Sequence, residues 1–457
     1  MCNLFILSTF AFATLIFCLA IITPCIQYTI CSAYAQDVNP HVAEHLKHRF
    51  TMENVFTGIN GTTNMAFIGP NDILALEADS GKVRRIVNGQ MLKEPLLDVN
   101  SFVPDGLIGI ATAATTINTT STQQNGLRYV FLYFDEAPLK YNADVETSEE
   151  ADKLNHTLGY VREGDRLYRY ELVNNKLVDP KLLFEIPDKT KNILGEMHHG
   201  GEVLIGPDNY VYLVIGDIDG HKNDDTRTKA QNYKNGTDPD GRAGILRITQ
   251  DGKPVGGAKG ILGDKNPLNL YYAYGIRSSF GMDFDPVTGN LWDTENGPDY
   301  GDEINLVYPG FNSGFDVVDG MPNDHNDNKK EFNPFTDLVD FNGKGKYSDP
   351  EFVWNKPVGP TAIKFLNSDK YGKEYQNDMF VGDINNGNIY HFDLNNNRTH
   401  FLLNGELKDK VADNSKELKD IIFAQGFNGI VDLQVGPDGY LYILSDGSIF
   451  RIRPLNN

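Results

Sequence analysis

A histidine and an aspartate are spaced along the chain so that they would meet at the ends of two paired strands. His198 stands in the run Met-His-His-Gly-Gly that opens an apolar strand, and Asp217 closes the strand after the next turn. In an antiparallel hairpin the start of the first strand lies beside the end of the second, so we expect the two side chains within hydrogen-bond reach. Such a carboxylate fixes the tautomer of the imidazole and raises its basicity, as in a general base. The competing interpretation is a turn histidine that faces solvent.

A second candidate group begins at Arg277, in the segment Tyr-Gly-Ile-Arg-Ser-Ser that leads into another predicted strand. An arginine before a run of small residues suits contact with an anion inside the fold. The turn at 295–298, Glu-Asn-Gly-Pro, follows the next strand, and its backbone carbonyls suit a hard cation such as Ca²⁺. Each signal alone is equally explained by a surface arginine and an ordinary turn.

These candidate residues are embedded in a repeated strand pattern. The repeat is a turn of the Gly-Pro-Asp type, then an alternating apolar strand, then an acidic or small residue. Proline and aspartate favour the turn, glycine or asparagine accepts positive φ, and β-branched and aromatic residues favour the strand. Four copies start at residues 69, 206, 284 and 436, and strand-like segments at 127–134 and 379–392 fill the gaps, which gives six units.

Six repeats of a four-stranded antiparallel unit predict an all-β, six-bladed β-propeller. Helical signals are few, and the best of them, at 142–154, is short and polar. A β-solenoid would need a much shorter repeat. We expect the longest polar insertions, at 219–241 and 312–347, to form loops on one face of the propeller, where functional residues tend to lie. The prediction is one domain over residues 36–457, with its blades between Phe56 and Pro454.

The first 35 residues differ from the rest of the chain. They carry no charged side chain, are rich in apolar residues and end in Ala-Tyr-Ala, the small-x-small pattern of a secretory cleavage site. We expect residues 1–35 to be a signal peptide, or an N-terminal membrane anchor if uncleaved, because the apolar stretch is longer than the usual signal core. The protein would then be secreted or tethered at the cell surface. All four cysteines lie in this segment, so the exported part has no disulfide.

The net charge of the chain is strongly negative, at −21, with 62 acidic and 41 basic residues. An acidic surface repels polyanions, which argues against nucleic acid and anionic lipid as partners. We expect membrane contact only through the N-terminal segment, if that segment stays uncleaved. Solubility accounts for most of the charge, and local aspartate clusters are candidates for cation binding.

The order of the motifs resembles the glucose/sorbosone dehydrogenases, a family of soluble quinoprotein sugar dehydrogenases. The shared landmarks are His-x-Gly-Gly, Gly-Pro-Asp…Ile-Gly-Asp, Tyr-Gly-x-Arg, Glu-x-Gly-Pro…Asp-Glu-Ile-Asn and a terminal Gly-Pro-Asp-Gly-x-Leu-Tyr. The resemblance spans residues 56–454 and is strongest at 197–305. It implies a propeller that oxidises the anomeric carbon of an aldose to a lactone, with hydride transfer to pyrroloquinoline quinone (PQQ) and onward transfer to an unknown electron acceptor.

The resemblance also implies roles for individual residues. His198 would be the general base, Asp217 its orienting carboxylate, and Arg277 would lie beside the quinone carbonyls. The backbone carbonyls of Gly297 and Pro298 would hold the Ca²⁺ that polarises the quinone. The positions of the cofactor contacts are occupied in this sequence by Arg277, Ser278, Asn296, Thr361 and Asn385.

The sequence departs from the family where the three carboxylates of the quinone would bind. Family members carry basic residues where this chain has Asn385 and the segment 428–432, Asn-Gly-Ile-Val-Asp. They also carry a glutamine where this chain has Pro104 and an asparagine where it has Ser278. Each lost contact costs about 1–3 kcal/mol, so we expect weaker quinone binding here. Basic residues that could compensate from other positions are Lys356, Lys364 and Arg451.

The sequence therefore predicts an exported quinoprotein-type aldose dehydrogenase with His198 as the general base. Two alternatives stay open at this point. One is a non-catalytic surface propeller that has lost the quinone and binds a glycan or a protein, which the missing basic residues favour. The other is a hydrolase or lactonase that uses Ca²⁺ held by the propeller, again with His198 as base.

Overall fold

The computed structural model describes residues 39–78, 80–99, 106–114, 128–136, 164–186, 198–218, 227–322 and 332–455. Residues His41–Asn457 form one compact unit. The predicted helix at 142–154, residue Pro104 and the N-terminal segment 1–35 lie outside the described residues. Within the described ranges, no helix is both long and apolar enough to span a bilayer.

The described residues are almost entirely strands and turns. Their one α-helix is the short α3 (Pro334–Asp337). The 3-10 helices among them are η1 (Glu44–Leu46), η3 (Lys229–Gln231), η4 (Leu268–Leu270), η5 (Gly405–Asp409) and η6 (Glu417–Asp420). The all-β prediction is confirmed.

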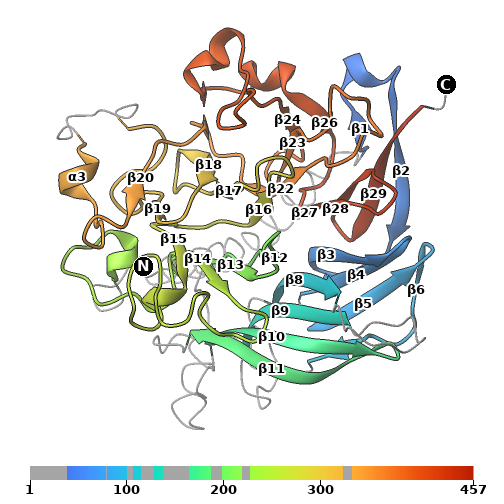
Figure 1. Cartoon of the computed structure of the whole chain (residues 1–457). Helices are drawn as coiled ribbons and strands as arrows, with labels where there is room; N and C mark the ends of the chain where they lie inside the picture. The colour runs from blue at the N-terminus through green and yellow to red at the C-terminus, as the bar shows by residue number, and fades with distance from the viewer. Residues whose placement is uncertain are drawn as a thin grey trace, which may run out of the picture. The chain divides into compact units, whose positions relative to one another are not determined.

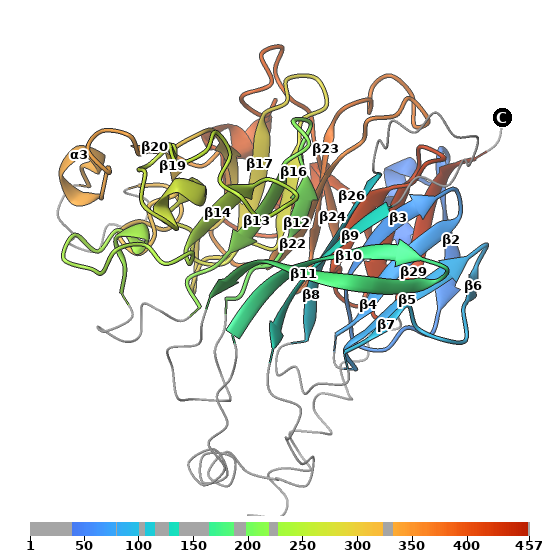
Figure 2. The same ribbon diagram turned by 60° about the horizontal axis from the view of Figure 1, so that its bottom comes forward.

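The described strands form six sheets. The first in chain order contains β3 (Thr62–Gly69), β4 (Asp72–Glu77), β5 (Lys82–Val87), β6 (Gln90–Met91) and β7 (Leu97–Asp98). The second contains β8 (Leu107–Ala114), β9 (Arg128–Glu136), β10 (Gly164–Val173) and β11 (Lys176–Ile186). The third contains β12 (Val203–Ile205), β13 (Val211–Ile215), β14 (Gly244–Ile248), β15 (Tyr271–Tyr274), β19 (Phe311–Asn312) and β20 (Lys346–Tyr347). In the second sheet, β10 and β11 form a long hairpin at the front of Figure 2.

The other three sheets follow the same scheme, with the innermost strand first. The fourth contains β16 (Gly281–Phe284), β17 (Leu291–Glu295), β18 (Asp302–Val307), β21 (Phe352–Trp354) and β25 (Val411–Ala412). The fifth contains β22 (Pro360–Phe365), β23 (Met379–Asp383), β24 (Ile389–Phe392), β26 (Ile422–Gln425) and β1 (His41–Val42). The sixth contains β27 (Asp432–Val435), β28 (Leu441–Ser445), β29 (Ser448–Pro454) and β2 (Phe50–Thr57).

The six sheets of the described chain close into a β-propeller. Their inner strands β3, β8, β12, β16, β22 and β27 contact one another in that order, and β27 contacts β3. A cluster of buried apolar side chains fills each junction between neighbouring sheets, and Figure 1 shows the sheets fanning out around a common centre. Four strands per sheet was predicted, and this holds for two of them. The others gain two-residue strands from loops, which leave no apolar repeat in the sequence.

Packing explains why the Gly-Pro-Asp turn recurs between the first and second strands of a sheet. The tyrosine four residues after the aspartate donates a hydrogen bond from its hydroxyl to that carboxylate. The distances are 2.8 Å from Tyr212 to Asp208 and 2.9 Å from Tyr442 to Asp438. A Cβ on Gly206 would lie 2.6 Å from the Tyr212 ring, so the tyrosine can fold back only over a glycine. The motif that revealed the repeat is therefore a structural one.

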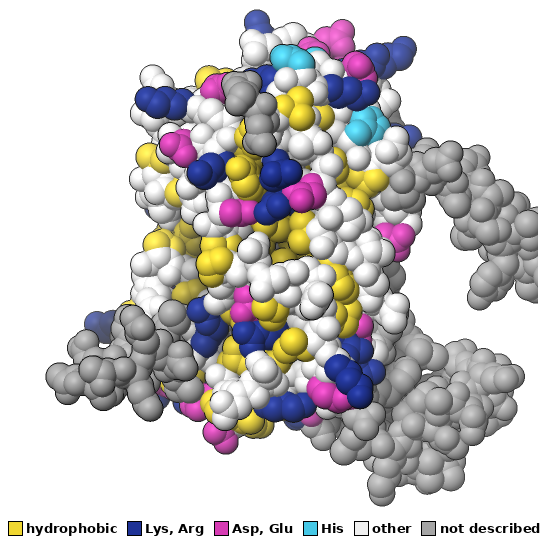
Figure 3. Space-filling view, turned by 90° about the vertical axis from the view of Figure 1, so that its right-hand side faces the viewer, with side chains coloured by type: hydrophobic (Ala, Val, Ile, Leu, Met, Phe, Trp, Pro, Cys, Tyr) yellow, Lys and Arg dark blue, Asp and Glu magenta, His cyan; other side chains and the backbone are white. Residues whose placement is uncertain are grey.

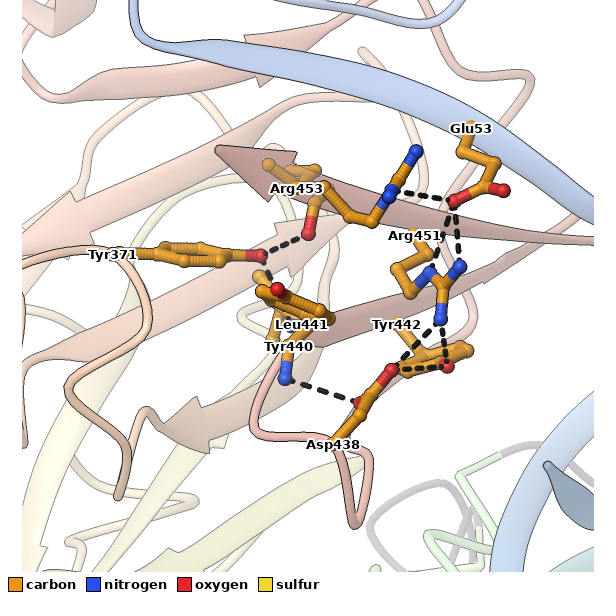
Figure 4. A network of polar contacts seen from close by, with 9 residues as sticks. Glu53, Tyr371, Asp438, Tyr440, Leu441, Tyr442, Arg451 and Arg453 are labelled. Atoms are coloured by element: carbon orange, nitrogen blue, oxygen red, sulfur yellow. Dashed lines mark hydrogen bonds and ion pairs between the residues drawn. The ribbon is translucent and has the colours of Figure 1, made fainter. Parts of the chain in front are cut away.

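An N-terminal strand closes the ring by pairing with the C-terminal strand. Figure 4 shows the ion pairs that join β2 to β29: Glu53 contacts Arg451 (2.7 Å) and Arg453 (2.8 Å). Arg451 also contacts Asp438 (2.8 Å). Two carboxylates thus engage Arg451, which was considered above as a replacement contact for the quinone. The face on the right of Figure 1, where these strands lie, carries acidic and basic side chains interspersed (Figure 3).

Candidate active site

The predicted site residues gather at one end of the propeller. His198 and Arg277 precede the inner strands β12 and β16, whereas Asp217 and the turn at 296–298 follow the second strands β13 and β17. Because first and second strands are antiparallel, the start of one and the end of the other share an end of the sheet. Asn385 follows the second strand β23 and lies at the same end.

The expected contact between His198 and Asp217 is present. Nδ1 of His198 lies 2.7 Å from Oδ1 of Asp217, which is fully buried, and the histidine side chain is 10% exposed. With Nδ1–H donating to the carboxylate, Nε2 carries the lone pair that a general base needs. His198 has a φ of 68°, a left-handed conformation that few residues other than glycine adopt and that often accompanies function. The catalytic role itself stays a prediction.

Close backbone packing at Gly216 brings the histidine loop against the arginine loop. A Cβ on Gly216 would lie 2.0 Å from the carbonyl oxygen of His198 and 2.6 Å from that of Arg277. The amide of Asp217 donates to the same Arg277 carbonyl at 2.8 Å. Gly200, with a φ of 65°, has the amide of Gly216 3.0 Å from the place of its own missing Cβ. Gly200 of the His-x-Gly-Gly motif and Gly216 of the Ile-Gly-Asp motif are thus required because the backbones of these loops pack so closely.

Arg277 lies on the turn that was predicted to hold a metal ion. Its Nη1 donates to the carbonyl oxygens of Asn296 (2.7 Å) and Gly297 (3.0 Å). Its backbone amide donates to Oε1 of Glu295 at 2.6 Å. The guanidinium therefore shares the Gly297 carbonyl with any cation that would bind there, while Pro298 is exposed at the surface.

Asp302 positions this turn, and reasoning from the sequence did not single it out. Its carboxylate accepts hydrogen bonds from the amides of Gly297 (2.9 Å), Val358 (2.7 Å) and Gly359 (2.7 Å). The amide of Asn385 in turn donates to the carbonyl of Val358 at 3.1 Å. Asp302 thus links the loops of two neighbouring sheets. The signal for it was the Asp-Glu-Ile-Asn landmark.

Two buried carboxyl groups beside the turn were also missed as candidate ligands. The hydroxyl of Ser313 donates to Oε2 of Glu295 (2.5 Å) and lies 3.5 Å from Oε2 of Glu303. Burial raises the pKa of Glu295 to about 8, and burial together with the charge of Glu295 raises the pKa of Glu303 well above its ordinary value. At neutral pH such a pair holds a proton or requires a cation, and carboxylates are ligands that Ca²⁺ prefers.

The remaining predicted contacts are placed differently. Ser278 is buried, and its carbonyl accepts from the amide of Asn296 at 2.7 Å. Thr361 is also buried and donates its hydroxyl to the carbonyl of Ile430, so it joins two inner-strand segments. The structure therefore brings Ser278 and Asn296 to Arg277, whereas the Thr361 hydroxyl is engaged by backbone.

A second histidine–aspartate pair lies next to the first. Nδ1 of His199 lies 3.0 Å from both carboxylate oxygens of Asp165, on the neighbouring sheet, and both residues are buried. The doubled histidine at 198–199 was the sequence signal for this pair. Because the two side chains come from different sheets, the pair ties the site to the sheet of β8–β11.

Lys364, another candidate replacement contact, lies among acids of the inner strands. Its Nζ is 3.6 Å from Oδ1 of Asp283. Burial alone would lower the pKa of Lys364, but the negative charges of Asp283, Glu202 and Asp432 outweigh it and raise the pKa above its ordinary value. Asn64 donates to Glu202 at 2.7 Å. These groups come from five different sheets, so Lys364 neutralises buried carboxylates there.

Replacing Glu202 with glutamine should flatten the dependence of stability on pH. Burial and the charge of Asp432 raise the pKa of Glu202 from 4.5 to about 8. The folded state therefore binds more protons between these values, and its stability falls as the pH rises through that window, by at most about 1.4 kcal/mol per pH unit for each proton. Glutamine removes this proton and can still accept from Asn64. Urea unfolding at pH 5, 6.5 and 8 measures how the free energy of unfolding changes with pH in the parent and in the variant. Equal slopes in the two proteins would contradict the prediction.

The chain is similar to known proteins of one family. The glucose/sorbosone dehydrogenase family model matches residues 60–452. Aldose sugar dehydrogenase YliI of Escherichia coli is 25% identical over 402 residues, covering 86% of this chain and 90% of that protein. Quinoprotein glucose dehydrogenase B of Acinetobacter calcoaceticus is 31% identical over 173 residues, covering 35% of this chain and 33% of that protein.

Solved structures share the fold. The soluble aldose sugar dehydrogenase of Escherichia coli in its apo form has a TM-score of 0.60 at 20% identity, covering 89% of this chain and 100% of that one. The PQQ-bound aldose sugar dehydrogenase of Streptomyces coelicolor has a TM-score of 0.57 at 18% identity, covering 89% and 99%. With the family model spanning nearly the whole propeller, the chain belongs to the glucose/sorbosone dehydrogenase family.

Proposed function

We propose that this protein is an exported, PQQ-dependent aldose dehydrogenase that oxidises the anomeric carbon of a sugar to a lactone. The observation that carries the proposal is the His198–Asp217 pair, with 2.7 Å between its polar atoms, on a propeller of this family. Arg277 adjoins it, because its carbonyl accepts from the Asp217 amide at 2.8 Å. A base and a fixed cation at one place are what hydride removal from a hydroxylated carbon requires.

The residues at the His198 end of the propeller suit the edge of a quinone that carries its carbonyl oxygens. Arg277 supplies a guanidinium for an oxygen that gains negative charge. The side-chain oxygen of Asn296 is buried and has no hydrogen-bond partner among the described residues, so it can accept from a donor on a bound molecule. The opposite edge fits less well, since Asn385, Gly429 and Val431 offer no positive charge to carboxylates. We therefore expect the quinone to bind, but weakly for this family.

His198 is the residue that moves the proton in the proposed reaction. Its Nε2 takes the proton of the anomeric hydroxyl, and Asp217 stabilises the imidazolium that forms. A bound quinone supplies the acceptor for the hydride. Asp302 keeps the turn under Arg277 in place through its three amide contacts. The low exposure of His198 limits competition from water.

Ca²⁺ belongs to the proposal at the Gly297–Pro298 turn. An ion at the Gly297 carbonyl would lie beside the guanidinium of Arg277, which donates to the same oxygen. The neighbouring carboxyl groups of Glu295 and Glu303 would offset that positive charge if both were ionised. Chelator treatment followed by readdition of Ca²⁺ would measure whether quinone binding needs the ion.

The proposal includes a sugar substrate, a separate electron acceptor and export directed by residues 1–35. The family and its aldose sugar dehydrogenase relatives support the sugar. The uncharged apolar leader that ends in Ala-Tyr-Ala supports export. Sizing the mature protein from the medium or the cell surface by mass spectrometry would test cleavage after Ala35.

Reconstitution of the purified protein with PQQ and Ca²⁺ tests the function. We expect a shift in quinone absorbance and aldose-dependent reduction of an artificial electron acceptor. No binding at near-millimolar quinone would contradict the proposal and favour the non-catalytic propeller that binds a glycan or protein. Lactone hydrolysis in Ca²⁺ without quinone would instead favour the hydrolase alternative.

A further inference from the structure

A histidine and two aspartates gather at the end of the fifth sheet that is remote from the candidate active site. Asp378 directly precedes β23, His391 lies in β24, and Asp393 directly follows β24. Met379 pairs with Phe392 in the antiparallel register, so Asp378 and Asp393 lie opposite each other on adjacent strands. His391 is two residues before Asp393 and therefore faces the same side of the sheet.

The ligand atoms of these three residues converge. Nε2 of His391 lies 2.9 Å from Oδ2 of Asp378 and 3.5 Å from Oδ1 of Asp393. One nitrogen and two oxygens, one atom from each residue, all lie within 4.8 Å of one another. A metal ion with bonds of about 2.0–2.2 Å places its ligand atoms roughly 3.0–3.5 Å apart. The separations from the histidine nitrogen, 2.9 and 3.5 Å, lie just below that range and at its upper end, so a small rearrangement would admit the ion.

The surroundings fix the histidine and leave space for further ligands. The rings of Tyr375 and Phe380 pack against the imidazole, with centroids 5.0 and 5.1 Å away. The side chain of Asp378 is 11% exposed, and that of Asp393 is 54% exposed. His391 and Asp393 line a cavity of about 360 Å³, whose wall also includes Leu402, Leu407, Glu406, Lys416, Glu417 and Asp420. Open coordination positions would face this cavity.

We propose that Asp378, His391 and Asp393 bind a divalent transition-metal ion of the Zn²⁺ class. One imidazole nitrogen with two carboxylate oxygens is a donor set that such ions accept, and softer sulfur ligands are missing. The two carboxylates balance the double charge of the ion, whereas a protonated His391 would balance only one of them. The remaining coordination positions take water or an anionic group in the cavity.

The bound ion would fasten the β23–β24 hairpin to the segment that follows it. Leu402 donates its amide to the Asp393 carbonyl (2.9 Å), and His391 donates its amide to the Ile421 carbonyl (2.8 Å). The metal ligands therefore lie at both ends of the loop that carries η5 and η6. Since ion binding to the folded state alone raises stability, Zn²⁺ should raise the melting temperature.

Calorimetric titration of the chelator-treated full chain with Zn²⁺ tests the proposal, with Co²⁺ absorbance as a second readout. The parent protein should bind one equivalent that is lost in His391→Gln and in Asp393→Asn. Asp393 is half exposed, so its variant is expected to fold, and circular dichroism checks this. His400→Gln is the matched control. Nδ1 of His400 lies 2.6 Å from Oε2 of Glu351, and His400 is not one of the three proposed ligands, so its variant should still bind one equivalent.

Two results would overturn the metal site. One is a parent protein that binds no Zn²⁺ at sub-millimolar concentration, which would leave His391 as an ion-pair partner of the two aspartates. The other is unchanged stoichiometry in both variants, which would place the ion elsewhere. Aldose oxidation in PQQ and Ca²⁺ should be the same in His391→Gln as in the parent, which separates this site from the proposed active site.

Discussion

Replacing His198 with glutamine is expected to lower kcat/KM for aldose oxidation by about 10²–10⁴-fold. Glutamine can still donate a hydrogen bond to Asp217, so the loop should keep its position, but the amide cannot take a proton. Asp217→Asn should produce a loss of similar order, because an amide oriented toward Nδ1 no longer favours the tautomer with its lone pair on Nε2. Steady-state rates with saturating PQQ and Ca²⁺ measure both effects.

Quinone binding provides the control for the His198 prediction. The absorbance titration with PQQ should give the same affinity for His198→Gln as for the parent, since the expected loss concerns proton transfer. His400→Gln should retain full activity, because the His400 side chain is 55% exposed and contacts Glu351, which is not among the predicted site residues. If His198→Gln kept more than half of the parent rate, another group would have to be the base.

Replacing Gly216 with alanine should abolish most of the activity and destabilise the fold. The new methyl group would lie 2.0 Å from the carbonyl oxygen of His198 and 2.6 Å from that of Arg277. Both atoms that the methyl group would clash with are backbone oxygens. A side-chain rotation therefore cannot remove the clash, and the two loops would have to move apart. Overpacking of this kind costs about 1–3 kcal/mol, and a displacement of His198 by about 1 Å costs on the order of 10²-fold in rate.

Gly69→Ala is the matched control for this substitution. A Cβ on Gly69 would meet its nearest atom, in Asp72, at 3.7 Å, an ordinary contact, and neither glycine has a positive φ. Urea unfolding and aldose oxidation should be nearly unchanged in Gly69→Ala and strongly reduced in Gly216→Ala. Equal behaviour of the two variants would mean that the close approach at Gly216 is not needed.

The elements that could be predicted from the sequence are those formed by local contacts. Each Gly-Pro-Asp turn and the strand after it use residues a few positions apart, so composition and alternation reveal them directly. The His198–Asp217 contact joins residues 19 positions apart across one hairpin, and antiparallel register alone brings them together. Because each copy of the turn-and-strand pattern is local, counting the copies also predicted the sheets of the propeller.

Contacts between sheets were decided only by the tertiary structure. Asp302 meets Val358 across 56 residues, and Glu53 meets Arg451 across 398, once the ring has closed. No periodic pattern in the sequence predicts such pairs, because the number of residues between the partners depends on how many sheets lie between them.

The tertiary structure also decided what the basic and acidic residues near the site do. Lys364 lies against Asp283 and Arg451 against Glu53, so neither matches its reading from sequence as a cofactor contact. Glu303 pairs with Glu295 in the antiparallel register of β17 and β18, and only the tertiary structure adds Ser313, from another segment, as a contact of both carboxyl groups. The sequence determined the fold class and, through strand register, the contact between His198 and Asp217. Closure of the ring determined which charged side chains contact one another. A buried charge is stable only beside a group that neutralises it, and here such groups come from other sheets.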